Sequence, residues 1–499
     1  MVHNGCWVKF YSFTFDLPKD IKMLKRVTIL LFVALFLVPM SLLAQESPQK
    51  AKNVILMVGD GMGFNHHIIG SYWRNGELGK NSYDAFPFHC AATTFSAKTK
   101  NTEVPRHHPG YDPQVFWSGA AAMNASSAIT GTTDSAASGS ALNTGVKTFN
   151  GGLGINASGQ PVEQTSDVAI AAGKSVGAVT TVVLTDATPA AVYARSQSRS
   201  NFAEIIVQSE KLTVLMGGGH PCFDGYGKPV AYDKFNYDSI GGKDIWEELI
   251  SPQGYFGFKY IDRAENFEQL AQGNDLPEKV FGLVRVRGDA PPIDGTPTVA
   301  KASPEDIAKV LGRFDTKEIP TLSTMSFAAL NVLAQNENGF YLMIEGGAID
   351  HAGHGNDALQ VAFEHTGFSK AIDTVVQWVE KNSSWEETVL VITADHETGF
   401  AWGRGSWIDT NKDGKFSLAD DEFVDFMPIV NEGPGKLPGV QFMTGGHSNS
   451  MVPVWGIGVG IEELENSVYG TDEEAAKRWN FSGKYIDNTD IAVFLKSKM

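Results

Sequence analysis

Cysteine is scarce in this sequence, with 3 residues among 499. One of them, Cys6, lies in an N-terminal segment that we expect to be removed, which leaves Cys90 and Cys222 far apart along the chain. At most one disulfide can therefore form in the mature protein. An oxidising compartment would permit that bridge. Two buried free thiols are the simpler interpretation, and the sequence leaves open whether the two cysteines pair.

Long runs of basic residues are also absent after residue 50, and the formal net charge is −17 at pH 7. Binding to a nucleic-acid backbone requires clustered positive charge, so we expect no nucleic-acid partner. The acidic excess suits a protein that carries several divalent cations. With 42% hydrophobic residues, the chain is neither fibrous nor disordered, and it can bury one large core or two domains of ordinary size.

Only one long apolar run occurs, and it lies near the N-terminus. Basic residues precede the apolar segment 27–38, and polar residues follow Ala44. This layout is typical of a secretory signal peptide, so we predict a leader at residues 1–44, with a true start at Met23 as a further hypothesis. We therefore expect an exported protein, periplasmic or extracellular, with no stable membrane insertion after cleavage. Extended to Ala44, the run could nearly span a bilayer, so an uncleaved N-terminal anchor is the alternative.

A buried strand is predicted at residues 340–344, where apolar residues follow one another without a period, as in a central parallel strand. Glu345 comes next, at the carboxyl edge where open α/β sheets hold their ligands. Asp350 and His354 are four residues apart, so one helical turn places a carboxylate and an imidazole on the same side. Such side chains bind zinc. A polar loop rich in glycine would explain this stretch equally well.

Further apolar segments predict strands that end at residues of the same chemical kinds. Residues 53–58 lead to Asp60 between glycines, a pattern that is also common in turns. Residues 388–394 deliver Asp395 and His396, which would suit either one side of a metal site or a structural hydrogen-bonded pair. His447 precedes another apolar segment, at 452–457.

Residues 128–141 predict the start of a helix, because hydroxyl and carboxylate residues precede small helix formers. The free backbone N–H groups and the dipole at such a start favour an anion, and Ser135 would lie where phosphate binds. Alternatively, Thr133 or Asp134 caps the helix and Ser135 has no role.

Residues 175–184 predict a strand, followed by Asp186, Thr188 and a proline suited to the first turn of a helix. We expect Arg195 and Arg199 to lie four apart on that helix, where one guanidinium could bind phosphate. Two surface arginines are the alternative. Residues 79–125 are predicted to be irregular, without chemistry.

A calcium loop is predicted between residues 409 and 420. Oxygen ligands stand at positions one, three and five of a twelve-residue loop, glycine stands at six, and a carboxylate closes the loop where glutamate is usual. The predicted calcium ligands are Asp409, Asn411, Asp413, Lys415 and Asp420. A solvated loop rich in aspartate and asparagine is the competing interpretation.

Taken together, these side chains resemble the alkaline phosphatase family in identity, order and approximate spacing, from Asn53 to near the carboxyl end. The residues that carry the resemblance are Asp60, Asp134-Ser135-Ala136, Asp186-Ala187-Thr188-Pro189, Arg199, Glu345, Asp350, His354, Asp395-His396 and His447.

The resemblance implies ligand sets for three metal ions. One zinc would be held by Asp350, His354 and His447. A second zinc would be held by Asp60, Asp395 and His396. Magnesium would share Asp60 and be completed by Thr188 and Glu345. Family members differ at the positions of Asp186 and His351, near magnesium or phosphate, so metal preference and pH optimum stay open.

The resemblance also implies hydrolysis of small phosphate monoesters through a phosphoserine at Ser135. Arg199 would hold phosphate oxygens, with Asp134 orienting its guanidinium. We expect an α/β fold with a large, mostly parallel central sheet flanked by helices on both faces and inserted capping loops. Residues 45–499 would form a single catalytic domain with insertions at about 221–304 and about 400–443. A homodimer is a family habit that the sequence does not test.

Two rival functions stay open. One is a phosphodiesterase or sulfatase on the same scaffold. Arg199 and a complete third metal set argue against it, because they would face the extra negative charge of a monoester. The other is a noncatalytic metal-binding or mineral-associated surface protein, and an intact Ser135 argues against that.

Overall fold

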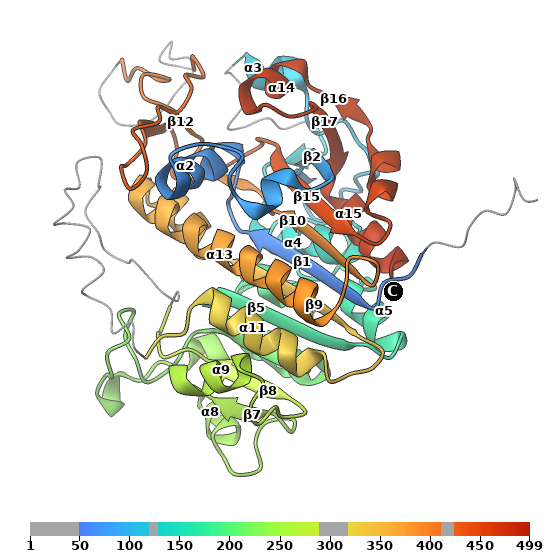
Figure 1. The fold of residues 1–499 in the computed structure, drawn as a ribbon, viewed down its shortest axis with the longest axis vertical. Coiled ribbons are helices and arrows are strands. Elements are labelled where there is room, and N and C mark those ends of the chain that lie inside the picture. Colours follow the sequence, from blue (N-terminus) through green and yellow to red (C-terminus); the bar gives the residue numbers. More distant parts are fainter. Residues whose placement is uncertain (1–48, 119–127, 289–317, 411–423) are drawn as a thin grey trace, which may run out of the picture. The chain divides into compact units, whose positions relative to one another are not determined.

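An eleven-stranded sheet runs through the protein (Figure 1). This computed structural model describes residues 49–118, 128–288, 318–410 and 424–499. In order across the sheet, the strands are β16 (Gly470–Thr471), β17 (Lys484–Asp487), β2 (Phe88–Thr93), β15 (Val452–Gly458), β10 (Thr388–Thr393), β1 (Asn53–Gly59), β9 (Phe340–Gly346), β5 (Ser175–Val183), β6 (Val214–Gly218), β8 (Val280–Leu283) and β7 (Lys259–Ile261).

The sheet is mostly parallel, as predicted. Six consecutive neighbouring pairs, from β10 through to β7, are parallel, and so is the pair of β17 with β2. The antiparallel pairs all involve β15 or β16. Every residue of β1 and of β9 is buried, because helices cover both faces of the sheet there. This burial explains why these strands read as continuous apolar runs in the sequence.

Helices pack on both faces of the sheet. The described helices are α2 (Phe64–Asn75), α3 (Pro113–Trp117), α4 (Ser135–Thr144), α5 (Thr165–Ala171), α6 (Ala187–Ala190), α7 (Phe202–Val207), α8 (Lys243–Leu249), α9 (Ala264–Ala271), α11 (Leu322–Leu333), α12 (Ala348–His354), α13 (Ala358–Asn382), α14 (Glu473–Trp479) and α15 (Asn488–Ser497). The described 3-10 helices are η2 (Ser82–Ala85), η3 (Gln208–Lys211), η4 (Tyr232–Lys234), η5 (Asp238–Ile240) and η7 (Ile461–Ser467).

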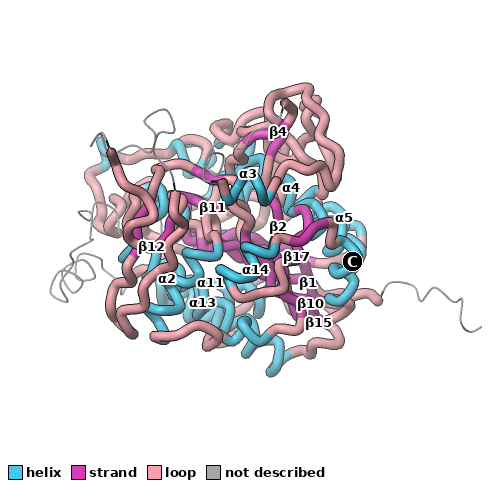
Figure 2. Tube along the Cα trace, turned by 90° about the horizontal axis from the view of Figure 1, so that it is seen from above, coloured by secondary structure: helices cyan, strands magenta, loops and turns pink. Residues whose placement is uncertain are grey.

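Two neighbouring residues of β9 identify the two helical layers. The Phe340 ring packs against Trp378 of α13, with ring centroids 5.8 Å apart, whereas the Tyr341 hydroxyl donates to Asn143 of α4 at 2.8 Å. Successive side chains of a strand point to opposite faces, so α13 and α4 lie on opposite sides of the sheet. Seen from above, α11 and α13 lie on one side of the strands and α4 and α5 lie on the other (Figure 2).

Within the described residues, three small two-stranded sheets lie outside the main sheet. They pair β3 (Ser96–Ala97) with β4 (Thr130–Gly131), β11 (Glu397–Thr398) with β14 (His447–Ser448), and β12 (Ala401–Gly403) with β13 (Val440–Phe442). The pair β11–β14 sets His447 opposite Thr398, two residues after His396. It therefore brings together two imidazoles that are 51 residues apart in the chain.

The prediction that residues 79–125 are irregular is wrong in part. Residues 88–93 form β2, which pairs with β15 and β17 inside the main sheet. Cys90, Ala91 and Ala92 make up its buried centre, and none of these residue types marks a strand. The pairing of this segment with β15 and β17, and not its local sequence, makes it a strand.

The segment predicted as a peripheral insertion adds β8 and β7 to one edge of the sheet, beyond β6. Residues 289–304 of that segment lie outside the described residues. Residues 49–499 group into one compact unit. Cys90 is buried, Cys222 is half-buried, and both are free thiols. Within the described ranges, no helix has both the length and the apolar composition needed to cross a membrane.

Candidate functional site

Four adjacent parallel strands end at one edge of the sheet, and polar residues follow or close each of them. Val58 of β1 is in register with Thr393 of β10 on one side and with Glu345 of β9 on the other. Glu345 is in register with Thr180 of β5. The next residues along these chains therefore meet at a single place, the carboxyl edge where open α/β sheets bind ligands.

One group of ligand atoms is formed by Asp350, His354 and His447. Asp350 and His354 lie on α12, one turn apart, as the spacing predicted. His354 Nε2 lies 3.3 Å from Asp350 Oδ2, and His447 Nε2 lies 3.5 Å from Asp350 Oδ1. The two Nε2 atoms are 3.1 Å apart. One ligand atom from each residue falls within 4.8 Å of the others, which is compatible with a single bound cation.

A second group is formed by Asp60, Asp395 and His396, all buried. His396 Nε2 lies 3.1 Å from Asp395 Oδ2 and 3.6 Å from Asp60 Oδ1. The His396 ring stacks on the His447 ring with centroids 3.6 Å apart, so the two groups are direct neighbours.

The turn after β1 fits between these groups only because residue 61 is glycine. Gly61 has a φ of +72°, and its N–H donates to Asp395 Oδ1 at 3.1 Å. A Cβ atom at this position would lie 2.6 Å from the Asp350 Cα and 2.9 Å from Thr398 Oγ1. Glycine is therefore needed here for both conformation and space.

All three imidazoles are oriented by their Nδ1 atoms. His354 Nδ1 donates to the Gly445 carbonyl at 2.7 Å, and His447 Nδ1 donates to the Thr133 carbonyl at 2.8 Å. His396 Nδ1 lies 3.3 Å from Thr398 Oγ1, whose hydroxyl donates to Asp350 Oδ1. Because each Nδ1 carries the ring proton, each Nε2 presents a lone pair to the site, as metal-binding histidines do.

Oxygen atoms form a third group beside the second one. Thr188 Oγ1 donates to Asp60 Oδ2 at 3.0 Å. Asp60 Oδ1 and Glu345 Oε1 are buried, and neither accepts a hydrogen bond from any described residue. Buried carboxylate oxygens without donors are costly, and a hard cation with oxygen ligands would satisfy them.

Negative charge is concentrated at this edge of the sheet. Burial raises the pKa of Asp60 well above its usual range, and the charges of Asp395 and Asp350 raise it further. Burial likewise raises the pKa of Glu345 to about 8. Burial opposes ionisation of Asp350 too, but hydrogen bonds with His354 and His447 outweigh it and hold the Asp350 pKa well below its usual range. Cations would offset this concentration of charge, and the three donor sets fit divalent metal ions.

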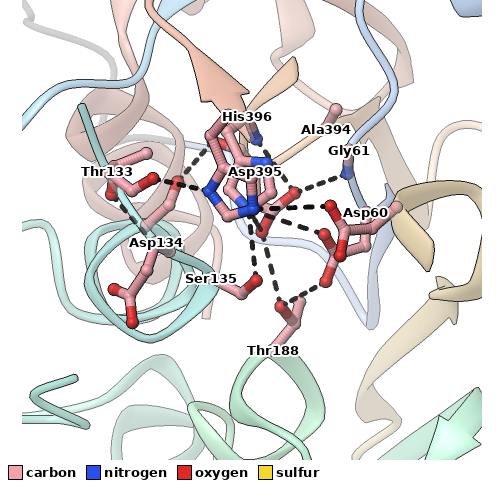
Figure 3. Close-up of polar contacts among 12 residues, drawn as sticks. Asp60, Gly61, Thr133, Asp134, Ser135, Thr188, Ala394, Asp395 and His396 are labelled. Atoms are coloured by element: carbon pink, nitrogen blue, oxygen red, sulfur yellow. Dashed lines mark hydrogen bonds and ion pairs between the residues drawn. The ribbon is translucent and has the colours of Figure 1, made fainter. Parts of the chain in front are cut away.

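Ser135 begins α4 and faces the second group. Asp134 is the N-cap, accepting from the Ala137 N–H at 2.9 Å, so the capping role that the sequence offered is real. The cap also directs Ser135 inward, where its Oγ lies 3.1 Å from His396 Nε2. Figure 3 shows Ser135, Thr188, Asp60, Asp395 and His396 directed toward one another. Asp134 can therefore cap the helix while its neighbour Ser135 faces the ligand groups.

Arg199 reaches the same region by a different route from the one predicted. Arg195 and Arg199 do not share a helix, because α6 ends at Ala190. Arg199 N–H donates to the Gly151 carbonyl at 2.8 Å, which anchors its loop beside the start of α4. The guanidinium donates to Asp186 Oδ1 at 2.7 Å and to Asp134 Oδ2 at 3.4 Å. These carboxylates raise the Arg199 pKa although burial alone would lower it.

The remaining predicted residues lie as follows. Asp186 is the N-cap of α6 and contacts Arg199. His351 is exposed on α12. Of the predicted calcium ligands, Asn411, Asp413, Lys415 and Asp420 lie outside the described residues, and so does the predicted leader.

Sequence reasoning missed two threonines that contact these groups. Thr398 Oγ1 joins Asp350 of the first group to His396 of the second. Thr180 Oγ1 donates to Glu345 Oε2 at 2.5 Å. Thr398 lies two residues after His396, so its place in the sequence could have identified it as part of the site. Thr180 lies 165 residues from Glu345, so only the strand register shows it.

Comparisons with known proteins identify similar sequences and similar folds. A sequence profile described as alkaline phosphatase matches residues 51–421. Alkaline phosphatase 4 of Bacillus subtilis is 31% identical over 363 residues, which cover 71% of this chain and 63% of that protein. The chain thus spans less than two thirds of this relative's length.

Solved alkaline phosphatases share the fold. The structure from Thermus thermophilus superposes with a TM-score of 0.58 and 20% identity, covering 93% of this chain and 95% of that one. A variant of the alkaline phosphatase from the Antarctic bacterium TAB5, in which a histidine is replaced by aspartate, has magnesium bound in its M3 site. It superposes with a TM-score of 0.54 and 22% identity, covering 90% of this chain and 99% of that one.

Proposed function

Because the chain belongs to the alkaline phosphatase family, we propose that it hydrolyses phosphate monoesters through a phosphoserine at Ser135. The observation that carries this proposal is the position of Ser135 Oγ, 3.1 Å from His396 Nε2 and at the start of α4. A hydroxyl at a helix N-terminus, beside two groups of metal-ligand side chains, is suited to attack a bound phosphate.

The chain's own residues account for each stage of such a reaction. The N–H groups at the start of α4 and the Arg199 guanidinium would bind the nonbridging oxygens of the phosphate. Ser135 Oγ would attack phosphorus, forming the Oγ–P bond as the hydroxyl proton leaves, while the bond to the alcohol oxygen breaks in line with it and that oxygen takes up a proton. Water would then attack the phosphoserine on the same face from which the alcohol left, releasing phosphate and restoring the Ser135 hydroxyl.

We assign the metal ions by ligand chemistry. Zinc suits the imidazole and carboxylate sets Asp350, His354, His447 and Asp60, Asp395, His396, and magnesium suits the all-oxygen set Asp60, Thr188, Glu345. When bound, two zinc ions would supply Lewis-acid stabilisation of the attacking and leaving oxygens, and magnesium would offset nearby negative charge. Asp186 adds one more carboxylate near the oxygen set and favours magnesium there; its charge raises the pKa of both Asp60 and Glu345.

The function is tested with matched esters of one alcohol. The purified protein, loaded with zinc and magnesium, should release phosphate from p-nitrophenyl phosphate and should be much slower on bis(p-nitrophenyl) phosphate. The reason is charge, since Arg199 and three cations can stabilise a dianionic monoester better than a monoanionic diester. A protein that prefers the diester, or p-nitrophenyl sulfate, is a phosphodiesterase or sulfatase. One that leaves all three esters intact would support the noncatalytic alternative.

Replacing Arg199 by alanine should lower kcat/KM for p-nitrophenyl phosphate by about 10- to 100-fold, the usual cost of losing charge-assisted hydrogen bonds. Arg195→Ala is the matched control. Arg195 lies four residues earlier and pairs with Asp167 and the Val162 carbonyl, away from Ser135. The control should retain kcat/KM while losing some thermal stability. Equal kcat/KM losses in both variants would contradict the phosphate-binding role of Arg199.

Three finer expectations remain proposals. We expect export through the leader predicted at residues 1–44, which N-terminal sequencing of the mature protein would test. The homodimer is tested by mass measurement in solution. Calcium binding at Asp409 and the residues after it is tested by calcium titration before and after Asp413→Ala.

A further inference from the structure

Strand β5 is irregular beside the oxygen group. Its register with β6 moves from Val179 opposite Met216 to Val183 opposite Gly218, so β5 advances four residues while β6 advances two. The extra residues form a β-bulge at the carboxyl end of the strand. Bulges near active sites redirect side chains. Here the bulge contains two consecutive threonines, Thr180 and Thr181.

The two threonine hydroxyls contact the carboxyl end of β9 and the residue that follows it. In a regular strand, consecutive side chains point to opposite faces. At this bulge, Thr181 Oγ1 accepts from the Gly347 N–H at 2.9 Å, and Thr180 Oγ1 donates to Glu345 Oε2 at 2.5 Å. The Thr180 hydroxyl also accepts from the Val182 N–H at 3.0 Å. That N–H occupies the hydroxyl's acceptor side, so the hydroxyl proton is directed to Glu345.

The methyl group of Thr180 is confined by a glycine on the next strand. A Cβ atom at Gly217 of β6 would lie 2.6 Å from Thr180 Cγ2. Gly217 therefore provides the space in which this methyl group sits. The fully buried Thr180 is thus held on both sides, with its methyl group against Gly217 and its hydroxyl between Val182 and Glu345.

Glu345 consequently has two different oxygens. Oε2 is held by Thr180, whereas Oε1 is buried and accepts no hydrogen bond from any described residue. Asp60 is arranged in the same way, with Oδ2 held by Thr188 and Oδ1 left without a donor. In each carboxylate, one oxygen is fixed by a threonine and the other is available to a ligand.

We propose that Thr180 is a positioning residue for the third metal ion: its hydroxyl holds Glu345 in the orientation in which the second carboxylate oxygen can bind magnesium. This inference rests on the proposed function, which places magnesium on Asp60, Thr188 and Glu345. Hydrogen bonds to metal-binding carboxylates orient them, and losing such a bond typically costs about 10- to 100-fold in metal affinity. Thr180 does not contact the zinc ligands, so zinc binding is not expected to depend on its hydroxyl.

The test compares Thr180→Val with Thr180→Ser. Valine keeps the branched shape and removes the hydroxyl, whereas serine keeps the hydroxyl. Magnesium chloride is titrated into zinc-loaded protein by calorimetry, and zinc content is measured by mass spectrometry. Thr180→Val should weaken magnesium binding by about 10-fold or more with unchanged zinc content, and Thr180→Ser should stay within about 3-fold of wild type.

Gly217→Ala provides a second approach that leaves Thr180 in place. The added methyl group should displace the Thr180 side chain, so this variant should also lose magnesium affinity while retaining zinc. Magnesium affinity equal to wild type in Thr180→Val would overturn the inference, as would equal losses of zinc and magnesium, which indicate general damage to the fold.

The outcome is separable from that of the proposed function. A wild-type protein that hydrolyses monoesters but takes up no magnesium beside zinc would overturn the role of Thr180 and leave the phosphatase activity standing. A protein that is inactive on p-nitrophenyl phosphate, but whose magnesium affinity still depends on Thr180, would overturn the phosphatase activity and leave the role of Thr180 standing.

Discussion

Replacing Ser135 by alanine is expected to lower kcat for p-nitrophenyl phosphate by roughly 1,000-fold or more, because the proposed route then lacks its nucleophile. Ser135 Oγ is the hydroxyl that points from the start of α4 into the second group of ligands. Asp134 would still cap the helix through its own side chain, so the loss should come from chemistry and not from unfolding.

Two measurements separate these causes. The Ser135→Ala protein should retain wild-type zinc and magnesium content, because Ser135 belongs to none of the three ligand sets. After an acid quench, labelled phosphate should be recovered on Ser135 of the wild-type protein and be missing from the variant. A variant that keeps its metals and turns over at the wild-type rate would exclude Ser135 as the nucleophile.

The metal-free protein is expected to become less stable as the pH rises from about 6.5 to about 8, and metal loading should reverse this trend. Below about pH 6.5, the buried imidazoles of His66, His89 and His365, whose pKa values burial lowers, act in the opposite direction. Glu345 is the clearest contributor, since burial raises its pKa from 4.5 to about 8. The native state therefore holds a proton that the unfolded state has already released at these pH values. The stability that Glu345 contributes is fully present below pH 4.5 and is lost as the pH rises through about 8.

Three other groups act in the same direction without metal. Burial and neighbouring carboxylates raise the pKa of Asp60. Hydrogen bonding to Asp350 raises the pKa of His354, and for His447 the same interaction outweighs the effect of burial. Asp350 and Asp395 have lowered pKa values, so their contribution to stability is lost only under more acidic conditions, below about pH 4.

Thermal unfolding should be followed on chelated and reloaded protein across this pH range. Metal ligands must be deprotonated, so the gain on reloading should grow with pH; an ion present at 100 times its Kd adds about 2.7 kcal/mol. An Arg195→Ala protein treated in the same way is a suitable control, because Arg195 lies outside the ligand sets. A chelated protein that is most stable near pH 8 would contradict the arrangement of buried carboxylates.

Much of the site could be predicted because its residues are attached to strongly patterned elements. The buried strands β1, β9 and β10 read as apolar runs, so Asp60, Glu345 and Asp395 could each be placed at a strand end. The spacing of Asp350 and His354 encoded one helical turn. By contrast, β2 carries small residues at its buried centre and was missed, and the two arginines were assigned to a helix that ends at Ala190.

The sequence by itself determined which side chains stand at the ends of buried strands and at the start of α4, since burial and helix capping depend on a few neighbouring residues. Only the tertiary structure decided what holds those side chains: the Gly445 and Thr133 carbonyls for two imidazoles, Thr398 for the third, and Thr180 for Glu345. Three of these four partners are between 91 and 314 residues away along the chain. Strand order and register bring such partners together, and no local pattern encodes a contact of that separation.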